Sequence, residues 1–226
     1  MTLFRQASAI AAKDLRTELR NREVTNAALS FSLVVLLLFS FAFDPISNPD
    51  TRAMAGGLLW VVYLFAGTLV LNRGFARETA NDALSGLAAA PVSGAAVFLG
   101  KATANWVMIL ALQLISLPFF GIFYDVRWTE KIPELAMILP LGAWALTAVG
   151  TIFGAVTAQN RLRELMLPLL VFPMCLPALM ACVQLTTLVF AGEPIGDSFA
   201  WVRLLIVFDV VFTLLGATLL EFVLRT

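Results

Sequence analysis

Few residues in this chain could do chemistry, and the sequence contains no histidine. Histidine is the commonest metal ligand and the commonest general base, so both roles lack their usual side chain. Cys175 and Cys182 lie seven positions apart in one apolar run. Seven helical residues rise about 10 Å, which is too far for a disulfide. We therefore expect two buried packing cysteines, no metal site and no catalytic group.

Residues 94–102 have a superficial likeness to a phosphate-binding loop. Two glycines precede Lys101, but five residues separate the glycines where the motif requires four. Ala102 also occupies the position at which a Ser or Thr would hold magnesium. Nothing in the sequence therefore predicts ATP binding by this chain.

Asp209 is the one ionisable residue that lies deep within an apolar run. A charged carboxylate there costs about 2.5–3.5 kcal/mol on insertion scales, so it should face protein or a water-filled cavity. Two interpretations stay open. Asp209 either belongs to a transport pathway or gate, or is an acid that fixes helix packing by bonding Gln113, Asn105, Gln184 or a threonine.

The elements that must position these residues are apolar helices. The 226 residues are 60% hydrophobic and 13% charged, with a mean hydropathy of +0.90. Soluble domains have about 45–50% apolar and 25% charged residues, so the solvent of this chain is lipid. The sequence predicts an all-α polytopic protein with one transmembrane domain over residues 1–226. Its six spans are expected at about 24–43, 54–72, 102–124, 133–158, 165–191 and 201–224.

The distribution of Lys and Arg predicts the orientation. Eleven of the 15 lie in residues 1–23, 73–101, 159–164 and the C-terminal tip, and four lie on the other side. The positive-inside rule then places both termini in the cytoplasm. Lys and Arg equal Asp and Glu in number, so no nucleic-acid partner is expected.

Residues 1–23 predict a short amphipathic arm. Phe4, Ala7, Ala11, Leu15 and Leu19 recur at helical spacing, with the basic residues mostly elsewhere around the helix. Such a helix can lie in the headgroup plane or be a solvated arm.

Three prolines, Pro168, Pro173 and Pro177, interrupt the fifth span. Each removes a backbone donor, so this helix is expected to be kinked or broken. It is either a moving part or a static kink.

The segment 73–101 begins with charges, passes into a small amphipathic stretch and ends at Lys101. These features predict a short charged helix parallel to the membrane, suited to docking in a groove of a soluble partner. An ordinary solvated loop would not need Leu84, Leu87 and the run of alanines beside them.

Within this segment, Arg77-Glu78, Leu84, Leu87 and Pro91-Val92 resemble the coupling helix of ABC exporter permeases. Over the whole chain, the charged leader of residues 4–20, the segment 72–101 and the proline-rich run 165–177 resemble the CcmB family. That family supplies the permease of the haem exporter system for cytochrome c maturation.

This resemblance implies a non-enzymatic permease subunit in the bacterial inner membrane. Its partners would be a separate cytoplasmic ABC ATPase that binds ATP, a second copy of itself, a haem-handling membrane protein and a periplasmic haem chaperone. ATP hydrolysis would drive haem export or release of the haem-loaded chaperone. The chain itself would bind no cofactor, because without histidine it lacks the usual axial ligand of haem.

The resemblance implies that six residues of the coupling helix transmit the movement of the ATPase to the spans: Arg73, Arg77, Glu78, Asp82, Leu84 and Leu87. The alternatives are an ABC permease for a lipid or drug, and an ATP-independent scaffold or ion-coupled carrier. Carriers usually show internal repeats and several intramembrane charges. Here there is no convincing repeat, and Asp209 is essentially alone.

Overall fold

The computed structural model describes residues 2–80, 92–158, 160 and 162–223, and all regular structure within them is helical. The long helices are α1 (Leu3–Asn21), α2 (Glu23–Phe43), α4 (Ala55–Ala80), α6 (Gly94–Tyr124), α7 (Ile132–Thr157), α8 (Arg163–Ala191) and α9 (Phe199–Val223). Three short elements join them: α3 (Pro49–Ala53), η1 (Trp128–Lys131) and η2 (Gly196–Ser198).

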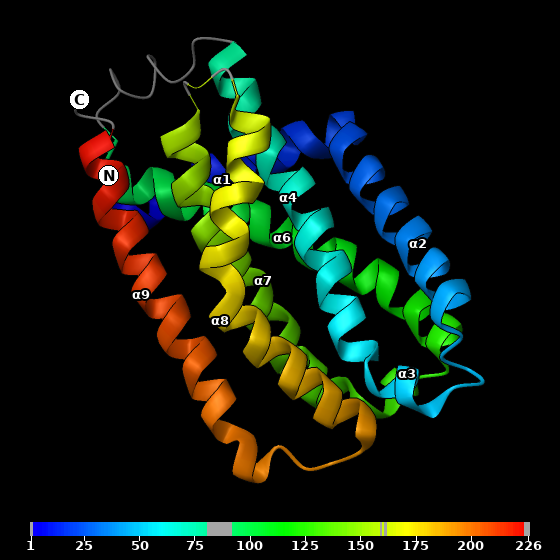
Figure 1. Ribbon diagram of the computed structural model, residues 1–226. Coiled ribbons are helices and arrows are strands. Elements are labelled where there is room, and N and C mark those ends of the chain that lie inside the picture. Colours follow the sequence, from blue (N-terminus) through cyan, green and yellow to red (C-terminus); the bar gives the residue numbers. More distant parts are fainter. Residues whose placement is uncertain (1, 81–91, 159, 161, 224–226) are drawn as a thin grey trace.

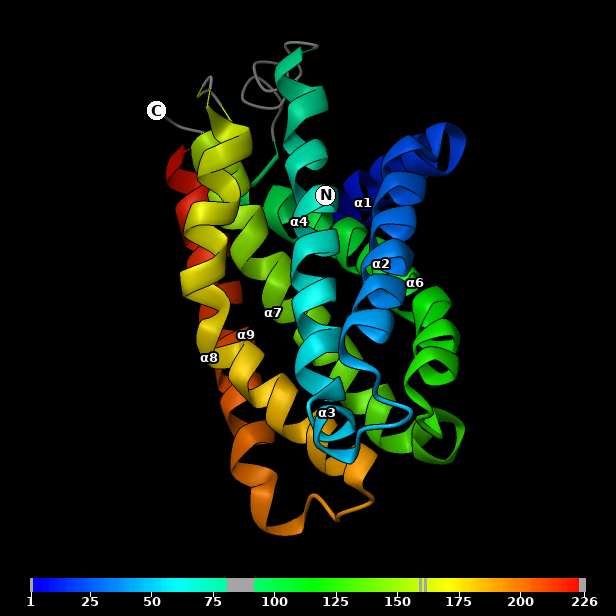
Figure 2. The same ribbon diagram turned by 45° about the vertical axis from the view of Figure 1, so that its right-hand side comes forward.

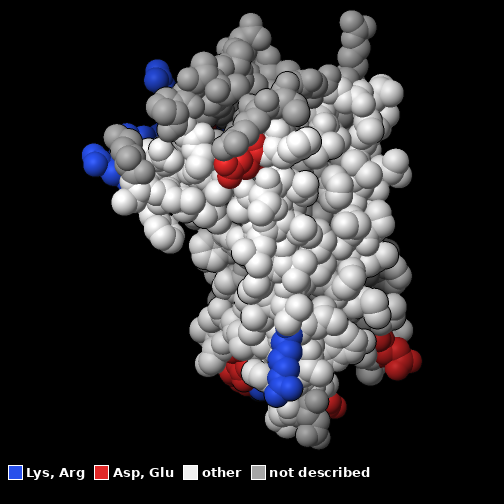
Figure 3. Space-filling model, turned by 90° about the vertical axis from the view of Figure 1, so that its left-hand side faces the viewer, with Lys and Arg blue, Asp and Glu red and all other residues white. Residues whose placement is uncertain are grey.

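Six helices of the described chain are long and apolar enough to cross a membrane: α2, α4, α6, α7 with η1, α8 and α9. The predicted all-α class and six spans are therefore confirmed. Charged side chains gather at the two ends of the molecule, with uncharged surface between them (Figure 3). This distribution is the one that a bilayer requires.

Two of the helices extend past the spans expected from apolarity. α4 continues to Ala80, eight residues beyond Asn72, and α6 begins at Gly94, eight residues before Ala102. Apolarity sets where a span ends, but capping sets where a helix ends. The Ser93 hydroxyl accepts a hydrogen bond from the Ala96 amide (3.3 Å) and so starts α6 early.

α4 and α7 form the centre of the bundle. Their apolar windows are 67% and 72% buried, against 17–33% for those of the other four spans. α4 packs against α2, α6, α7 and α8, and α7 packs against α4, α6, α8 and α9. α2 and α9 lie on opposite flanks of the bundle (Figures 1 and 2).

The end of the bundle that carries α1 is called the α1 end below, and the end that carries α3 is called the α3 end (Figure 1). The chain turns from α1 into α2 at Arg22, whose φ of 49° is left-handed. The Glu18 carboxylate accepts hydrogen bonds from the Thr25 amide (3.2 Å) and hydroxyl (3.0 Å) across this corner. The expected N-terminal helix is present, and its placement in the headgroup plane stays a prediction.

Candidate coupling site at the α1 end

The α1 end is built from α1, the first turns of α2, α6 and α8, and the last turns of α4, α7 and α9 (Figures 1 and 2). α4 protrudes there beyond its neighbours (Figures 1 and 2). Its residues 73–80 rise about 12 Å past the end of the span at Asn72. This extension is the most prominent described feature of the α1 end.

Three of the six predicted coupling residues, Arg73, Arg77 and Glu78, lie on the extension of α4. Positions 73 and 77 are four residues apart and so lie on one side of the helix. Asp82, Leu84 and Leu87 lie outside the described residues. The structure thus brings the first three residues together on one element, and their coupling role stays a prediction.

The beginning of α6 is fixed against α9. A Cβ built on Gly94 would lie 2.3 Å from the backbone nitrogen and Cα of Glu221. Only glycine allows the two helix backbones to approach this closely. The segment after residue 91 is therefore anchored to the last turns of α9.

The arm α1 packs along the first turns of α6, and the contacts include a close backbone approach and an ion pair. A Cβ on Gly100 would lie 2.8 Å from both the Ala7 carbonyl oxygen and the Ile10 Cβ. The neighbouring Lys101 is 3% exposed, and its Nζ lies 3.4 Å from Oδ2 of Asp14. Lys13 approaches the other oxygen of Asp14, at 3.0 Å.

The Asp14–Lys101 pair joins the charged leader to the end of the segment 73–101, which sequence reasoning treated as separate. A signal for it exists in the sequence, because a lysine at the head of an apolar run requires an anionic partner when it is buried. Several acids could serve, so the sequence does not identify Asp14. Of the predicted apolar face of α1, Ala7 and Ala11 are buried, whereas Phe4 and Leu19 are 80% and 67% exposed.

Asp209 lies in α9 within the bundle and is 6% exposed. The Thr213 hydroxyl donates to the Asp209 backbone carbonyl (2.6 Å) and accepts a hydrogen bond from the Trp144 indole (2.9 Å). In the described structure, neither carboxyl oxygen of Asp209 has a hydrogen-bond partner. Both interpretations of Asp209 stay predictions.

The expected amide partners of Asp209 do not bond to it. Both side-chain amide atoms of Gln113 also lack a hydrogen-bond partner among the described residues. The Gln113 backbone carbonyl instead accepts from the Tyr63 hydroxyl (3.3 Å). Among the described residues, buried side-chain polar atoms without a hydrogen-bond partner therefore lie on α6 and α9, and also on α7, at Thr151 and Glu134.

The three prolines of the fifth span all lie inside α8, which remains helical from Arg163 to Ala191. The axis of α8 bends in its middle (Figures 1 and 2). Each proline removes one hydrogen bond, and the remaining bonds of each turn keep the helix continuous. Movement of α8 stays a prediction.

The described residues contain no group of three or more His, Cys, Asp or Glu side chains that could hold a metal ion. Cys175 and Cys182 are both free and buried, as their spacing predicts.

Fold and surface together define a polytopic, all-helical membrane protein with a docked N-terminal arm and one helix that protrudes from the α1 end. The sequence model of the CcmB protein family matches residues 5–225, so the chain belongs to the CcmB family.

Three curated relatives share most of their length with this chain, and each is named heme exporter protein B. The protein of Rhodobacter capsulatus is 32% identical over 78% of this chain and 80% of its own length. The Pseudomonas aeruginosa protein is 28% identical over 86% of both chains. That of Bradyrhizobium diazoefficiens is 25% identical over 82% of both.

Proposed function

We propose that the chain is the permease subunit of an ABC transporter complex that delivers haem for c-type cytochrome biogenesis. A separate ATPase subunit hydrolyses ATP, and the permease couples this to haem export or to release of a haem-loaded chaperone. The names of the relatives support the haem pathway. The observation that carries the coupling role is the extension of α4 past the membrane span, with positions 73, 77 and 78 on it.

In this proposal the chain spans the inner membrane of a bacterial cell, and its α1 end faces the cytoplasm. The ATPase contacts the extension of α4 and the segment 81–91 that follows it. α4 lies at the bundle centre against four other spans, so a force on its end reaches most of the bundle. The anchors of α6 on α1 and α9 hold the other end of the segment while α4 is pushed.

The complex contains further chains. ABC machines use two nucleotide-binding subunits, so a second copy of this permease is expected, with a haem-handling membrane protein and a periplasmic haem chaperone. Haem is the cargo of the complex and is held by these partners, because the chain has no histidine to offer as an axial ligand.

The coupling role is tested by replacing Arg77 and Glu78 with alanine, singly and together, in the intact complex. The variants should insert in the membrane at the wild-type level but retain less ATPase subunit on purification, with lower ATP turnover in the complex. Arg203→Ala is the matched control, because Arg203 is an exposed arginine near the α3 end of α9.

If the Arg77 and Glu78 variants assemble and hydrolyse ATP as the Arg203 variant does, the coupling assignment is wrong. A strain that lacks the permease tests the haem pathway. If the ATPase subunit binds the wild-type permease but the deletion strain still makes its c-type cytochromes, the haem pathway is wrong instead.

A further inference from the structure

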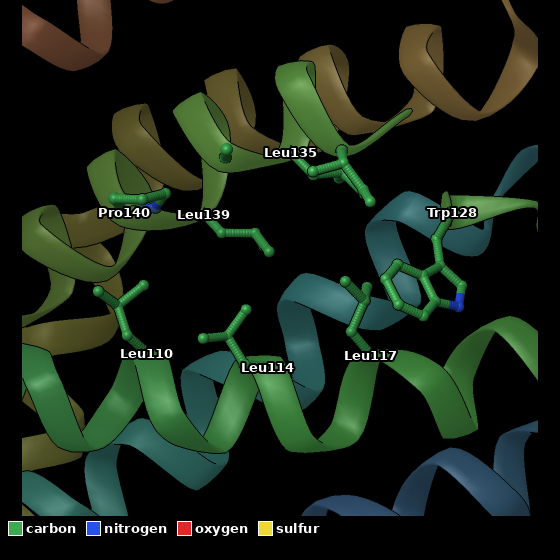
Figure 4. Close-up of a pocket in the computed structure, with 9 residues that line it drawn as sticks. Leu110, Leu114, Leu117, Trp128, Leu135, Leu139 and Pro140 are labelled. Carbon is green, nitrogen blue, oxygen red and sulfur yellow. The ribbon is translucent and has the colours of Figure 1, made fainter. Parts of the chain in front are cut away.

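An apolar groove runs between α6 and α7 in the half of the bundle nearest the α3 end (Figure 4). Leucines of α6 point into it from one side and leucines of α7 from the other (Figure 4). It is lined by Leu110, Leu114, Leu117, Trp128, Ile132, Leu135, Ala136, Leu139 and Pro140, and its volume is about 300 Å³. The lining is almost wholly apolar.

The groove has a closed floor and an open rim. Leu117, Leu135 and Leu139 are at most 4% exposed and form its floor, whereas Leu114 and Ile132 are 62% and 54% exposed at its rim. Because α6 and α7 are long and apolar enough to cross a membrane, the open side lies at the depth of the bilayer. The groove is therefore an indentation of the membrane-embedded surface.

Both ends of the groove are closed by tryptophans. At the deep end, the Trp106 indole of α6 donates to the Pro140 carbonyl of α7 at 2.9 Å. At the outer end, Trp128 of η1 lies directly on Gly121 of α6, where a Cβ would come within 2.3 Å of the ring. The groove thus has a defined length, from the membrane boundary to the level of Pro140.

Its dimensions match one hydrocarbon chain. The eight helical steps from Ile132 to Pro140 give a length of about 12 Å, which is close to half of a hydrocarbon core of about 30 Å.

The outer end of the groove adjoins polar groups. Trp128 and Ile132 face the groove, but Arg127, Glu130 and Lys131 line a separate polar cavity of about 570 Å³ beside it. In the described structure Lys131 has no ion pair, and the Trp128 indole N–H has no acceptor. Lys131, next to the rim residue Ile132, and the free N–H donor of Trp128 at the outer end of the groove complement a phosphate attached to a hydrocarbon chain.

We propose that this groove binds one phospholipid of the leaflet at the α3 end. An acyl chain lies between α6 and α7, and the phosphate contacts Lys131 and the Trp128 indole. Van der Waals packing of the methylenes against Leu117, Leu135 and Leu139 holds the chain. The bound lipid thereby fills the space between α6 and α7.

The occupant is identified by a photocrosslinking amino acid at position 136, on the exposed rim of the groove, in the full chain in its native membrane. Ala42 is the matched control, since it is an exposed alanine near the α3 end of α2. After extraction in mild detergent, extensive washing and illumination, position 136 should give an adduct with the mass of a phospholipid. Position 42 should give none.

Equal phospholipid adducts at both positions would show bulk lipid and overturn the proposal. An adduct of position 136 with a polypeptide would also overturn it, because a partner helix would then occupy the groove.

A second measurement counts bound lipid by native mass spectrometry. Ala136→Trp fills the groove and should lower retained phospholipid by about tenfold relative to Ala42→Trp, because several buried methylenes lose their contacts. Lys131→Gln should lower retention by a smaller factor, since one charged contact to phosphate is lost. Wild-type retention by Ala136→Trp would contradict the groove assignment.

Discussion

Replacing Gly100 with alanine should loosen the contact between α1 and α6. A Cβ at this position would lie 2.8 Å from the carbonyl oxygen of Ala7 and 2.8 Å from the Cβ of Ile10. Backbone atoms cannot yield as a flexible side chain does, so α1 must shift as a unit. That shift lengthens the 3.4 Å contact between Asp14 and Lys101, whose side chain is buried.

The loss of stability in Gly100→Ala is estimated by comparison with alanine at a second glycine, Gly57. A Cβ on Gly57 of α4 would meet only the Val183 Cγ1, at an ordinary 3.7 Å. Both substitutions gain about 1 kcal/mol of helix propensity, so this gain cancels between the two variants. The remaining difference is the cost of overpacking at Gly100, about 1–3 kcal/mol.

Two assays compare Gly100→Ala with Gly57→Ala. Thermal unfolding in detergent should give the Gly100 variant a Tm several degrees lower, because 1 kcal/mol corresponds to about 2–4 °C in a chain of this length. Trypsin should also cleave α1 faster at Lys13, Arg16 and Arg20, which lie on the loosened helix. Equal Tm values and equal cleavage rates would refute the docking of α1 on α6.

Two further substitutions test the interior. Thr186→Val removes the acceptor of the buried Trp60 indole (2.9 Å) and should destabilise the protein by about 1–3 kcal/mol. Thr218→Val is the control and should change Tm little, because the Thr218 hydroxyl is exposed and bonds within its own helix. Equal Tm values for these two variants would contradict the interhelical bond. Asp209→Asn should keep or raise Tm, because the carboxyl has no hydrogen-bond partner to lose and the amide carries no charge to bury. A fall of several degrees in the Asp209 variant would show that the acid has a partner.

The spans were predictable because apolarity is a property of consecutive residues. A run such as 201–224 predicts a membrane helix whichever helices it packs against, and α9 covers Phe199–Val223. Helix ends were less predictable. Residues 73–80 were expected beyond the second span, in a charged segment with a short helix parallel to the membrane, yet α4 continues through them, because helical bonding does not stop at the membrane surface.

The candidate coupling site was predictable only as a stretch of chain. Arg73, Arg77 and Glu78 were singled out by type and spacing, and α4 carries all three. The Asp14–Lys101 pair joins residues 87 positions apart, and no local pattern reports such a contact. The contact between the start of α6 and α9 is equally absent from local patterns, because it depends on one glycine, Gly94, that lets the two helix backbones approach each other.

The sequence by itself determined the solvent of this protein, the number and order of its spans, its family and its expected orientation. These depend on composition and on charges counted along the chain. The tertiary structure alone decided that α4 and α7 are central, that α1 docks on α6, and that α6 and α7 leave a groove between them. In lipid, no hydrophobic force selects which apolar face is buried. Close contacts at glycines such as Gly94 and Gly100 and a few polar pairs make that choice, and they leave almost no trace in the sequence.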